Sequence, residues 1–156
     1  VDSDGNTPIH IAVEKKVSAQ KLDTLIKMGY PVSQRNGKGV TPLNMAITNG
    51  QKRLALTLIE RGADPFAATI TGDNALTNAF KNGNVEILDA ICKYNARKTD
   101  TAGDSILHYA ARLANDVQVR HLLELGLDRT AKNLSGETPS KMAARWNRPA
   151  IAELLK

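Results

Sequence analysis

Apolar residues recur along this chain in short stretches with helical spacing. In one kind of stretch they stand three residues apart, as in Ile9/Ala12, Leu43/Ala46 and Leu107/Ala110. A second kind carries an i, i+3, i+4 stripe, as in Leu22/Leu25/Ile26, Leu88/Ile91/Cys92 and Val119/Leu122/Leu123. Residues at these spacings share one face of a helix, so the pattern predicts an all-α fold built from pairs of short amphipathic helices.

Polar and small residues mark where these helices begin and end. Thr7, Thr41 and Thr138 each precede a proline, which predicts a helix N-cap followed by proline in the first turn. Gly29, Gly62 and Gly126 follow the second helices, where a left-handed residue commonly ends a helix. Asn95 holds this position in the third copy, and we expect it to take the same conformation.

The helix pairs repeat. Gly5, Gly39, Gly72, Gly103 and Gly136 follow one another at intervals of 34, 33, 31 and 33 residues. The blocks around them are "DGNTPIHIA", "KGVTPLNMA", "TGDNALTNA", "AGDSILHYA" and "SGETPSKMA". One helix pair cannot bury its apolar face alone, so we expect the repeats to stack. The predicted repeats span residues 1–35, 36–68, 69–99, 100–132 and 133–156.

The period and the segments Thr7-Pro8-Ile9-His10-Ile11-Ala12 and Gly62-Ala63-Asp64 resemble the ankyrin repeat over the whole chain. The resemblance implies a solenoid of stacked antiparallel helix pairs, joined by extended β-turn-like loops that project as fingers. Fingers and first helices then form a concave face. We expect one domain over residues 1–156 and, because the first repeat is close to consensus, a fragment of a longer protein.

Three departures from the repeat predict local irregularities. The first repeat has an extra residue near Lys16 to Ser18, between its helices. The loop from Asn95 to Gly103 is two residues shorter than its equivalents, which predicts a shorter finger. Ser140 and Lys141 replace apolar and His positions in the last repeat, as suits a terminal cap.

Composition narrows the setting and the classes of site. Cys92 is the single cysteine of 156 residues, so internal disulfides and multi-cysteine metal sites are excluded, and Cys92 is expected in the core. The lack of a long apolar run argues against a membrane span, and we expect a cytoplasmic monomer. The net charge is +5, concentrated toward the end of the chain in Arg129, Lys132, Lys141, Arg145, Arg148 and Lys156.

The segment "GDSILH" contains the one tempting catalytic pattern, since it matches the nucleophile block of GDS(L) esterases. In the repeat alignment, however, Ser105 stands at the N-cap position of Thr7, and His108 at the position of His10. No D-x-x-H motif supplies the base that such a nucleophile needs. In ankyrin-like repeats this histidine ties successive loops together. We therefore predict no catalysis, no metal and no cofactor, with His121 part-exposed on a second helix.

The resemblance places partner recognition on fingers and on the ends of the first helices. Matching positions give the predicted partner-binding residues Lys38, Asp73, Lys81, Asn82, Asp104, Arg112, Leu113, Glu137, Arg145 and Trp146. Arg112, Leu113, Arg145 and Trp146 occupy equivalent positions in adjacent repeats and should be neighbours, suited to a peptide with acidic and apolar residues. We predict a protein-protein interaction module. The alternatives are binding of nucleic acid or an anionic surface through the basic last repeat, and a substrate-recruiting arm of a larger enzyme.

Overall fold

The computed structural model describes residues 1–156 and contains ten helices and no strands. The helices are α1 (Pro8–Glu14), α2 (Ala19–Lys27), α3 (Pro42–Thr48), α4 (Lys52–Glu60), α5 (Ala75–Asn82), α6 (Val85–Asn95), α7 (Ile106–Leu113), α8 (Asp116–Glu124), α9 (Pro139–Arg145) and α10 (Pro149–Leu154). The all-α prediction is confirmed.

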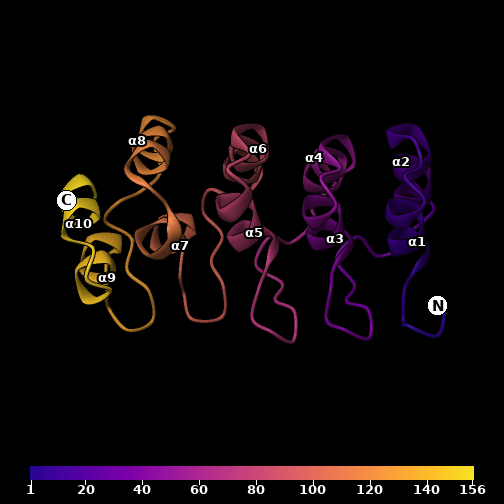
Figure 1. Ribbon diagram of the computed structural model, residues 1–156, viewed down its shortest axis with the longest axis horizontal. Helices are drawn as coiled ribbons and strands as arrows, with labels where there is room; N and C mark the ends of the chain where they lie inside the picture. The colour runs from indigo at the N-terminus through magenta and orange to yellow at the C-terminus, as the bar shows by residue number, and fades with distance from the viewer. The chain divides into compact units, whose positions relative to one another are not determined.

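The chain forms two compact units, residues 1–94 (unit 1) and 95–156 (unit 2). In unit 1, α1 packs on α3, α3 on α5, and α2 on α4. Figure 1 shows α1, α3 and α5 in one row and α2, α4 and α6 in a second, with the long loops extending beyond the first row. In unit 2, α7 packs on α9 and α8 on α10. Each unit is thus a stack of helix pairs.

Side-chain caps start the first helix of every pair. The hydroxyls of Thr7, Thr41, Ser105 and Thr138 and the amide of Asn74 accept hydrogen bonds from backbone N–H groups of the first turn. These bonds satisfy donors that a helix start otherwise leaves unpaired. The predicted caps are confirmed, including the assignment of Ser105 to this role.

The second helices end as predicted in three repeats and differently in the other. Gly29, Gly62 and Gly126 have φ angles of 97°, 86° and 81°. The prediction for Asn95 is wrong, because Lys16 and Asn147 are the only non-glycine residues with positive φ. Helix α6 continues through Asn95 and has 11 residues, against 9 in α4. The extension of α6 shortens the following loop further, to residues 96–99, against residues 61–68 after α4.

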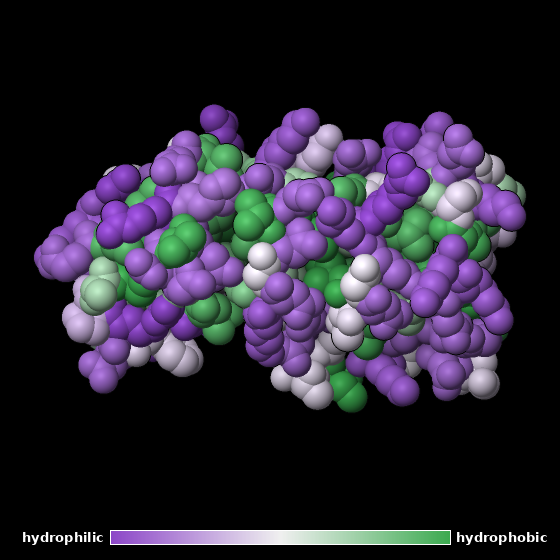
Figure 2. All heavy atoms as spheres, turned by 45° about the horizontal axis from the view of Figure 1, so that its top comes forward, coloured by the Kyte–Doolittle hydropathy of each residue, from purple (hydrophilic) through white to green (hydrophobic).

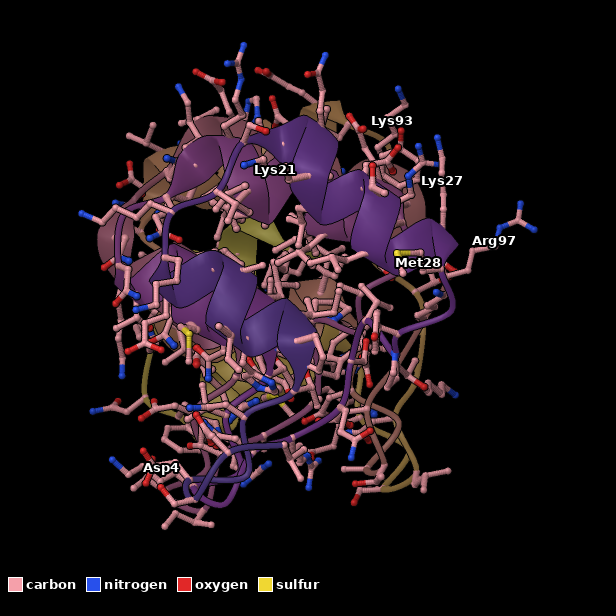
Figure 3. The ribbon with its side chains drawn as sticks, turned by 90° about the vertical axis from the view of Figure 1, so that its right-hand side faces the viewer. Asp4, Lys21, Lys27, Met28, Lys93 and Arg97 are labelled. Carbon is pink, nitrogen blue, oxygen red and sulfur yellow. The ribbon has the colours of Figure 1, made fainter.

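Five fingers share one hydrogen-bonded turn, at residues 2–6, 36–40, 69–73, 100–104 and 133–137. In each, the first residue's N–H donates to the last residue's carbonyl, and the glycine N–H donates back to the first residue's carbonyl. The shortened loop before α7 keeps this turn, with Asp100 N–H donating to the Asp104 carbonyl at 3.0 Å. Figure 3 shows Asp4 at a finger tip, away from α1 and α2.

In two repeats a buried histidine ties the first helix to the next finger. The Nδ1 atom of His10 accepts from the Thr7 N–H at 3.1 Å, so the ring proton is on Nε2, which donates to the Val40 carbonyl at 2.8 Å. His108 makes the same pair of contacts, with Ser105 and Glu137. The implied role of these histidines in tying successive loops together is confirmed.

The core is aliphatic and alanine-rich, as composition predicts. Its fully buried side chains include Leu22, Leu58, Ile91 and Leu122, and Cys92 packs among them at 4% exposure. Burial raises the pKa of the Cys92 thiol to about 12, so the thiol is protonated at neutral pH. Hydrophilic side chains dominate the face seen in Figure 2, with apolar ones between them. None of the helices has the length and apolar character that crossing a bilayer requires.

Candidate functional site

The Ser105–His108 pair has the contact of a catalytic dyad but a structural role. Ser105 Oγ lies 2.8 Å from His108 Nδ1. The imidazole is fully buried, and its Nε2 is bonded to the Glu137 carbonyl. Thr7 and His10 repeat the arrangement, with Oγ1 and Nδ1 2.9 Å apart. A contact that recurs at every histidine-bearing repeat belongs to the scaffold.

An arginine and two aromatic rings from α7 and the end of α9 lie together in unit 2. The Arg112 guanidinium lies over the Tyr109 ring, 4.7 Å from its centroid, and over the Trp146 ring at 5.8 Å. Both distances are in the range of cation–π attraction. Tyr109 is fixed in turn, because its hydroxyl donates to Asp100 Oδ2 at 2.7 Å. We call Tyr109, Arg112 and Trp146 the aromatic–arginine cluster.

The cluster lies at the surface, although one ring is buried. Trp146 is 50% exposed and Leu113, beside Arg112 in sequence, is 39% exposed, whereas Tyr109 is 6% exposed. The structure thus brings Arg112 and Trp146 together, as their repeat positions predict. The sequence prediction omitted Tyr109 and Asp100. The spacing of three residues between Tyr109 and Arg112, which puts them on one helix face, could have identified the ring.

Three arginines of unit 2 differ in how far their donors are used. Arg148 donates to the carbonyls of Ala110, Ala111 and Ala114 at the end of α7. Arg145 donates two hydrogen bonds to the Glu137 carboxylate, from Nε at 2.7 Å and from Nη2 at 3.0 Å. The nearest charged partner of Arg112 is Asp104, at 3.8 Å, too far for a hydrogen bond. Its Nε is buried and has no hydrogen-bond partner. A ligand can therefore meet only the terminal amino groups of this side chain, which is 24% exposed.

Arg145 favours the ionised form of Glu137, beside this cluster. The hydrogen bond from Arg145 lowers the pKa of Glu137 and the same pair raises the pKa of Arg145. Asp104 differs from the expectation of an open finger position. It is 7% exposed, and its carboxylate accepts from Asn133 Nδ2 at 2.8 Å. It links two fingers, because Asn133 belongs to the next one.

The predicted residues of unit 1 form a separate, more polar surface. Lys81 Nζ lies 3.0 Å from Asp73 Oδ1, and this hydrogen bond lowers the pKa of Asp73. Asn82 Nδ2 donates to the Ile47 carbonyl at 3.4 Å, so its amide helps to hold α5 to α3. Lys38 is exposed beside a groove of about 480 Å³ on this face.

The basic residues near the end of the chain are largely paired within the molecule. Arg129 donates to the Lys156 carbonyl at 2.7 Å, and Lys156 pairs with Glu153. With Arg145 and Arg148 also engaged, only Lys132 and Lys141 of the six predicted cations have no such contact. No group of three or more His, Cys, Asp or Glu side chains is arranged to hold a metal ion.

Comparison with known proteins gives relatives along the whole chain. The B-cell lymphoma 3 protein homolog of Mus musculus is 30% identical over 149 residues, which covers 92% of this chain and 33% of that protein. The SH3 and multiple ankyrin repeat domains protein 2 of Homo sapiens is 27% identical over 156 residues, 98% of this chain and 8% of that protein. The chain therefore spans a third or less of the length of these relatives.

Solved structures show the same architecture. A chain in the complex of the predatory endopeptidase Bd0816 of Bdellovibrio bacteriovorus with the immunity protein Bd3460 is 26% identical, with a TM-score of 0.69 over 99% of this chain and 81% of that one. The ankyrin repeat protein EF0377 shares the fold, with a TM-score of 0.67, 24% identity, and 99% and 82% coverage. The family described as "Ankyrin repeats (3 copies)" matches residues 1–69 and 76–156. The chain belongs to the ankyrin repeat family.

Proposed function

We propose that this chain is a non-catalytic protein-protein interaction module whose unit 2 binds a peptide carrying acidic and apolar residues. The observation that carries the proposal is the state of Arg112. Its guanidinium lies over two aromatic rings, and its nearest carboxylate, that of Asp104, is 3.8 Å away, beyond hydrogen-bond distance. Exposed Trp146 and Leu113 supply apolar surface beside it.

The chemistry of these side chains suits a carboxylate next to an apolar group. Stacking fixes the plane of the Arg112 guanidinium, so a partner carboxylate meets donors that are already oriented. Little side-chain entropy is then lost on binding. Tryptophan and arginine are also the residue types that most often dominate binding energy at protein interfaces. Together, Arg112 and Trp146 would favour a partner that places an acidic side chain next to an apolar one.

The comparisons support protein binding in general. Ankyrin repeats serve as binding surfaces, and one structural neighbour is described in a complex with an immunity protein. The partner of the present chain is proposed only by chemical class. Three predictions from the sequence stay predictions. They are a cytoplasmic location, a monomeric state, and the alternative that these repeats recruit substrate for a larger enzyme.

Nucleic-acid binding is the weaker alternative. Phosphate binding depends on accessible cations. Of the six basic side chains near the end of the chain, Arg145 and Lys156 pair with acids, and Arg129 and Arg148 donate to backbone carbonyls. A short DNA duplex titrated at increasing salt tests this alternative. Binding tighter than that of a selected peptide, with steep salt dependence, would favour nucleic acid over our proposal.

The direct experiment selects peptides on the immobilised chain from a random phage library. We expect the enriched peptides to combine Asp or Glu with apolar residues. By calorimetry, Arg112→Ala should weaken the synthesised peptide about tenfold or more, as for an interface hot spot. Lys141→Ala, which removes an exposed cation from α9, should change affinity little.

Circular dichroism and thermal unfolding confirm that each variant is folded. If the enriched peptides contain no acidic residue, or if the two substitutions have equal effects, the proposed site is wrong.

A further inference from the structure

The first-helix side of unit 1 contains a groove of about 480 Å³ between the fingers 36–40 and 69–73. Its walls include Lys38, Val40, Met45, Thr48, Ile70 and Asn78. The groove therefore combines apolar side chains, neutral polar groups and one cation. All of its residues belong to unit 1.

The apolar part of the groove is partly exposed to solvent. Ile70 is 80% exposed at the tip of its finger, while Val40 and Met45 are half-buried. Together these three side chains form a continuous apolar lining at one place, unlike an isolated exposed residue, which would need no explanation. An aliphatic side chain inserted here would remove that surface from water.

At two positions the groove carries shorter side chains than the equivalent surface of unit 2. Met45 and Thr48 occupy the repeat positions that Tyr109 and Arg112 hold in unit 2. In unit 2 the ring and the guanidinium stack on each other. The shorter side chains of unit 1 leave room for a ligand at these positions.

The charges of the groove leave one cation free. Asp73 is paired with Lys81 at 3.0 Å and accepts from the Thr71 hydroxyl at 3.3 Å. Lys38 is exposed and makes no ion pair. The free charge at the rim is thus positive and is complementary to a carboxylate.

We propose that this groove binds an extended peptide segment in which an aliphatic residue is directly followed by glutamate or aspartate. The aliphatic side chain lies against Val40, Met45 and Ile70, and the carboxylate pairs with Lys38. The Thr48 hydroxyl donates to the Asn44 carbonyl and the Asn78 amide nitrogen donates to Asn44 Oδ1, so both side chains offer mainly their oxygens as acceptors to peptide N–H groups. The inference rests on the proposed protein-binding function but adds a second site, in unit 1.

The test is a titration of the whole chain with the blocked dipeptide acetyl-Leu-Glu-amide, followed by the methyl NMR signals of Val40, Met45 and Ile70. We expect saturable shifts at these three residues. Acetyl-Gly-Glu-amide should give none, because it lacks the aliphatic side chain. Acetyl-Leu-Gln-amide should bind about two- to fivefold more weakly, as expected for the loss of one exposed ion pair.

Matched variants locate the site. Ile70→Asp should abolish the shifts of Val40 and Met45, and Lys38→Gln should remove the preference for Glu over Gln. Leu134→Asp is the control, because Leu134 holds the same repeat position in unit 2 and is 81% exposed; it should leave the titration unchanged.

Three results would overturn the inference: no saturable shift, equal shifts in the Ile70→Asp and wild-type chains, or tighter binding of acetyl-Leu with a free terminal carboxylate. The last would identify a chain terminus as the ligand. The indole signal of Trp146 reports on unit 2 in the same titrations. Failure at the groove with an intact Trp146 response would leave the proposed function standing, and loss of both would reject both.

Discussion

The two units carry different side chains on the same backbone positions of their first helices. In unit 2, Arg112 is stacked on two rings and an exposed tryptophan stands beside it. In unit 1, the positions of Tyr109 and Arg112 hold Met45 and Thr48, and the surface is hollowed into a groove. The surface of unit 2 exposes a guanidinium that lies over aromatic rings, whereas the surface of unit 1 contains an open groove.

The backbone beneath these surfaces is alike in both units. Each has hydroxyl caps, a buried histidine bonded to the next finger, and the same hydrogen-bonded turn at each finger tip. The comparison shows that the repeat frame depends on a few residues, while the intervening positions are free to determine what is bound.

The largest effect is expected at the finger glycines. A Cβ at Gly103 would lie 2.8 Å from the Leu134 nitrogen, and one at Gly5 equally close to the Gly37 nitrogen, both at positive φ. Gly103→Ala and Gly5→Ala should each lower the free energy of unfolding by about 3 kcal/mol, from strain plus displaced backbone. Urea unfolding measures the loss.

Gly136→Ala is the matched control for these substitutions. Its φ is 75°, but a Cβ there meets nothing within 4 Å. It should therefore cost only the conformational strain, about 1 kcal/mol. Equal losses at Gly103 and Gly136 would show that finger contact does not stabilise the stack.

Transplanting the residues of unit 2 into unit 1 should abolish the difference between the surfaces. The double variant Met45→Tyr, Thr48→Arg fills the groove at the positions of Tyr109 and Arg112. Affinity for acetyl-Leu-Glu-amide at the Ile70 methyl signals should fall about tenfold, which corresponds to about 1.4 kcal/mol. A folded double variant that binds the dipeptide as the wild type does would contradict our account of why the groove is open.

The smallest effect concerns the histidine of unit 1. Burial lowers the pKa of His10, so the unfolded chain takes up a proton that the folded chain resists. Neutral His10 contributes its full stability above the pKa of an unfolded histidine, about 6.5. That stability is lost as the pH falls from there through the lower pKa of His10 in the folded chain. Urea unfolding between about pH 7 and pH 5.5, above the range of the carboxylates, should show this loss, and His10→Gln should reduce it. A free energy of unfolding that rises as the pH falls from about 7 to about 5.5 would contradict this role of His10.

The sequence predicted the frame well because the frame depends on local chemistry. A threonine before a proline, a glycine after a helix and a period near 33 each have one simple structural reading, and Ser105 was assigned correctly through its repeat position. Asn95 was not, because α6 runs two residues further than α4 and includes this position, and the length of a helix does not depend on the residue at its end alone.

The surfaces were less predictable, because side-chain contacts between repeats decide them. Equivalent repeat positions indicated that Arg112 and Trp146 are neighbours. They did not indicate that Tyr109 stacks on Arg112, or that Asp104 is buried against Asn133. The groove beside Ile70 depends on the combined size of side chains from two repeats, which no single motif specifies.

We propose that Arg112, which lies over the rings of Tyr109 and Trp146, is the recognition residue of unit 2. Trp146 is the single tryptophan of the chain, so its fluorescence reports on this site alone. A selected peptide without tryptophan should change that emission saturably. Arg112→Lys should weaken binding about tenfold, because an ammonium cannot reproduce the stacked, planar set of donors. Peptide binding that calorimetry detects with no change in Trp146 emission, or with equal affinity in Arg112→Lys, would contradict the claim.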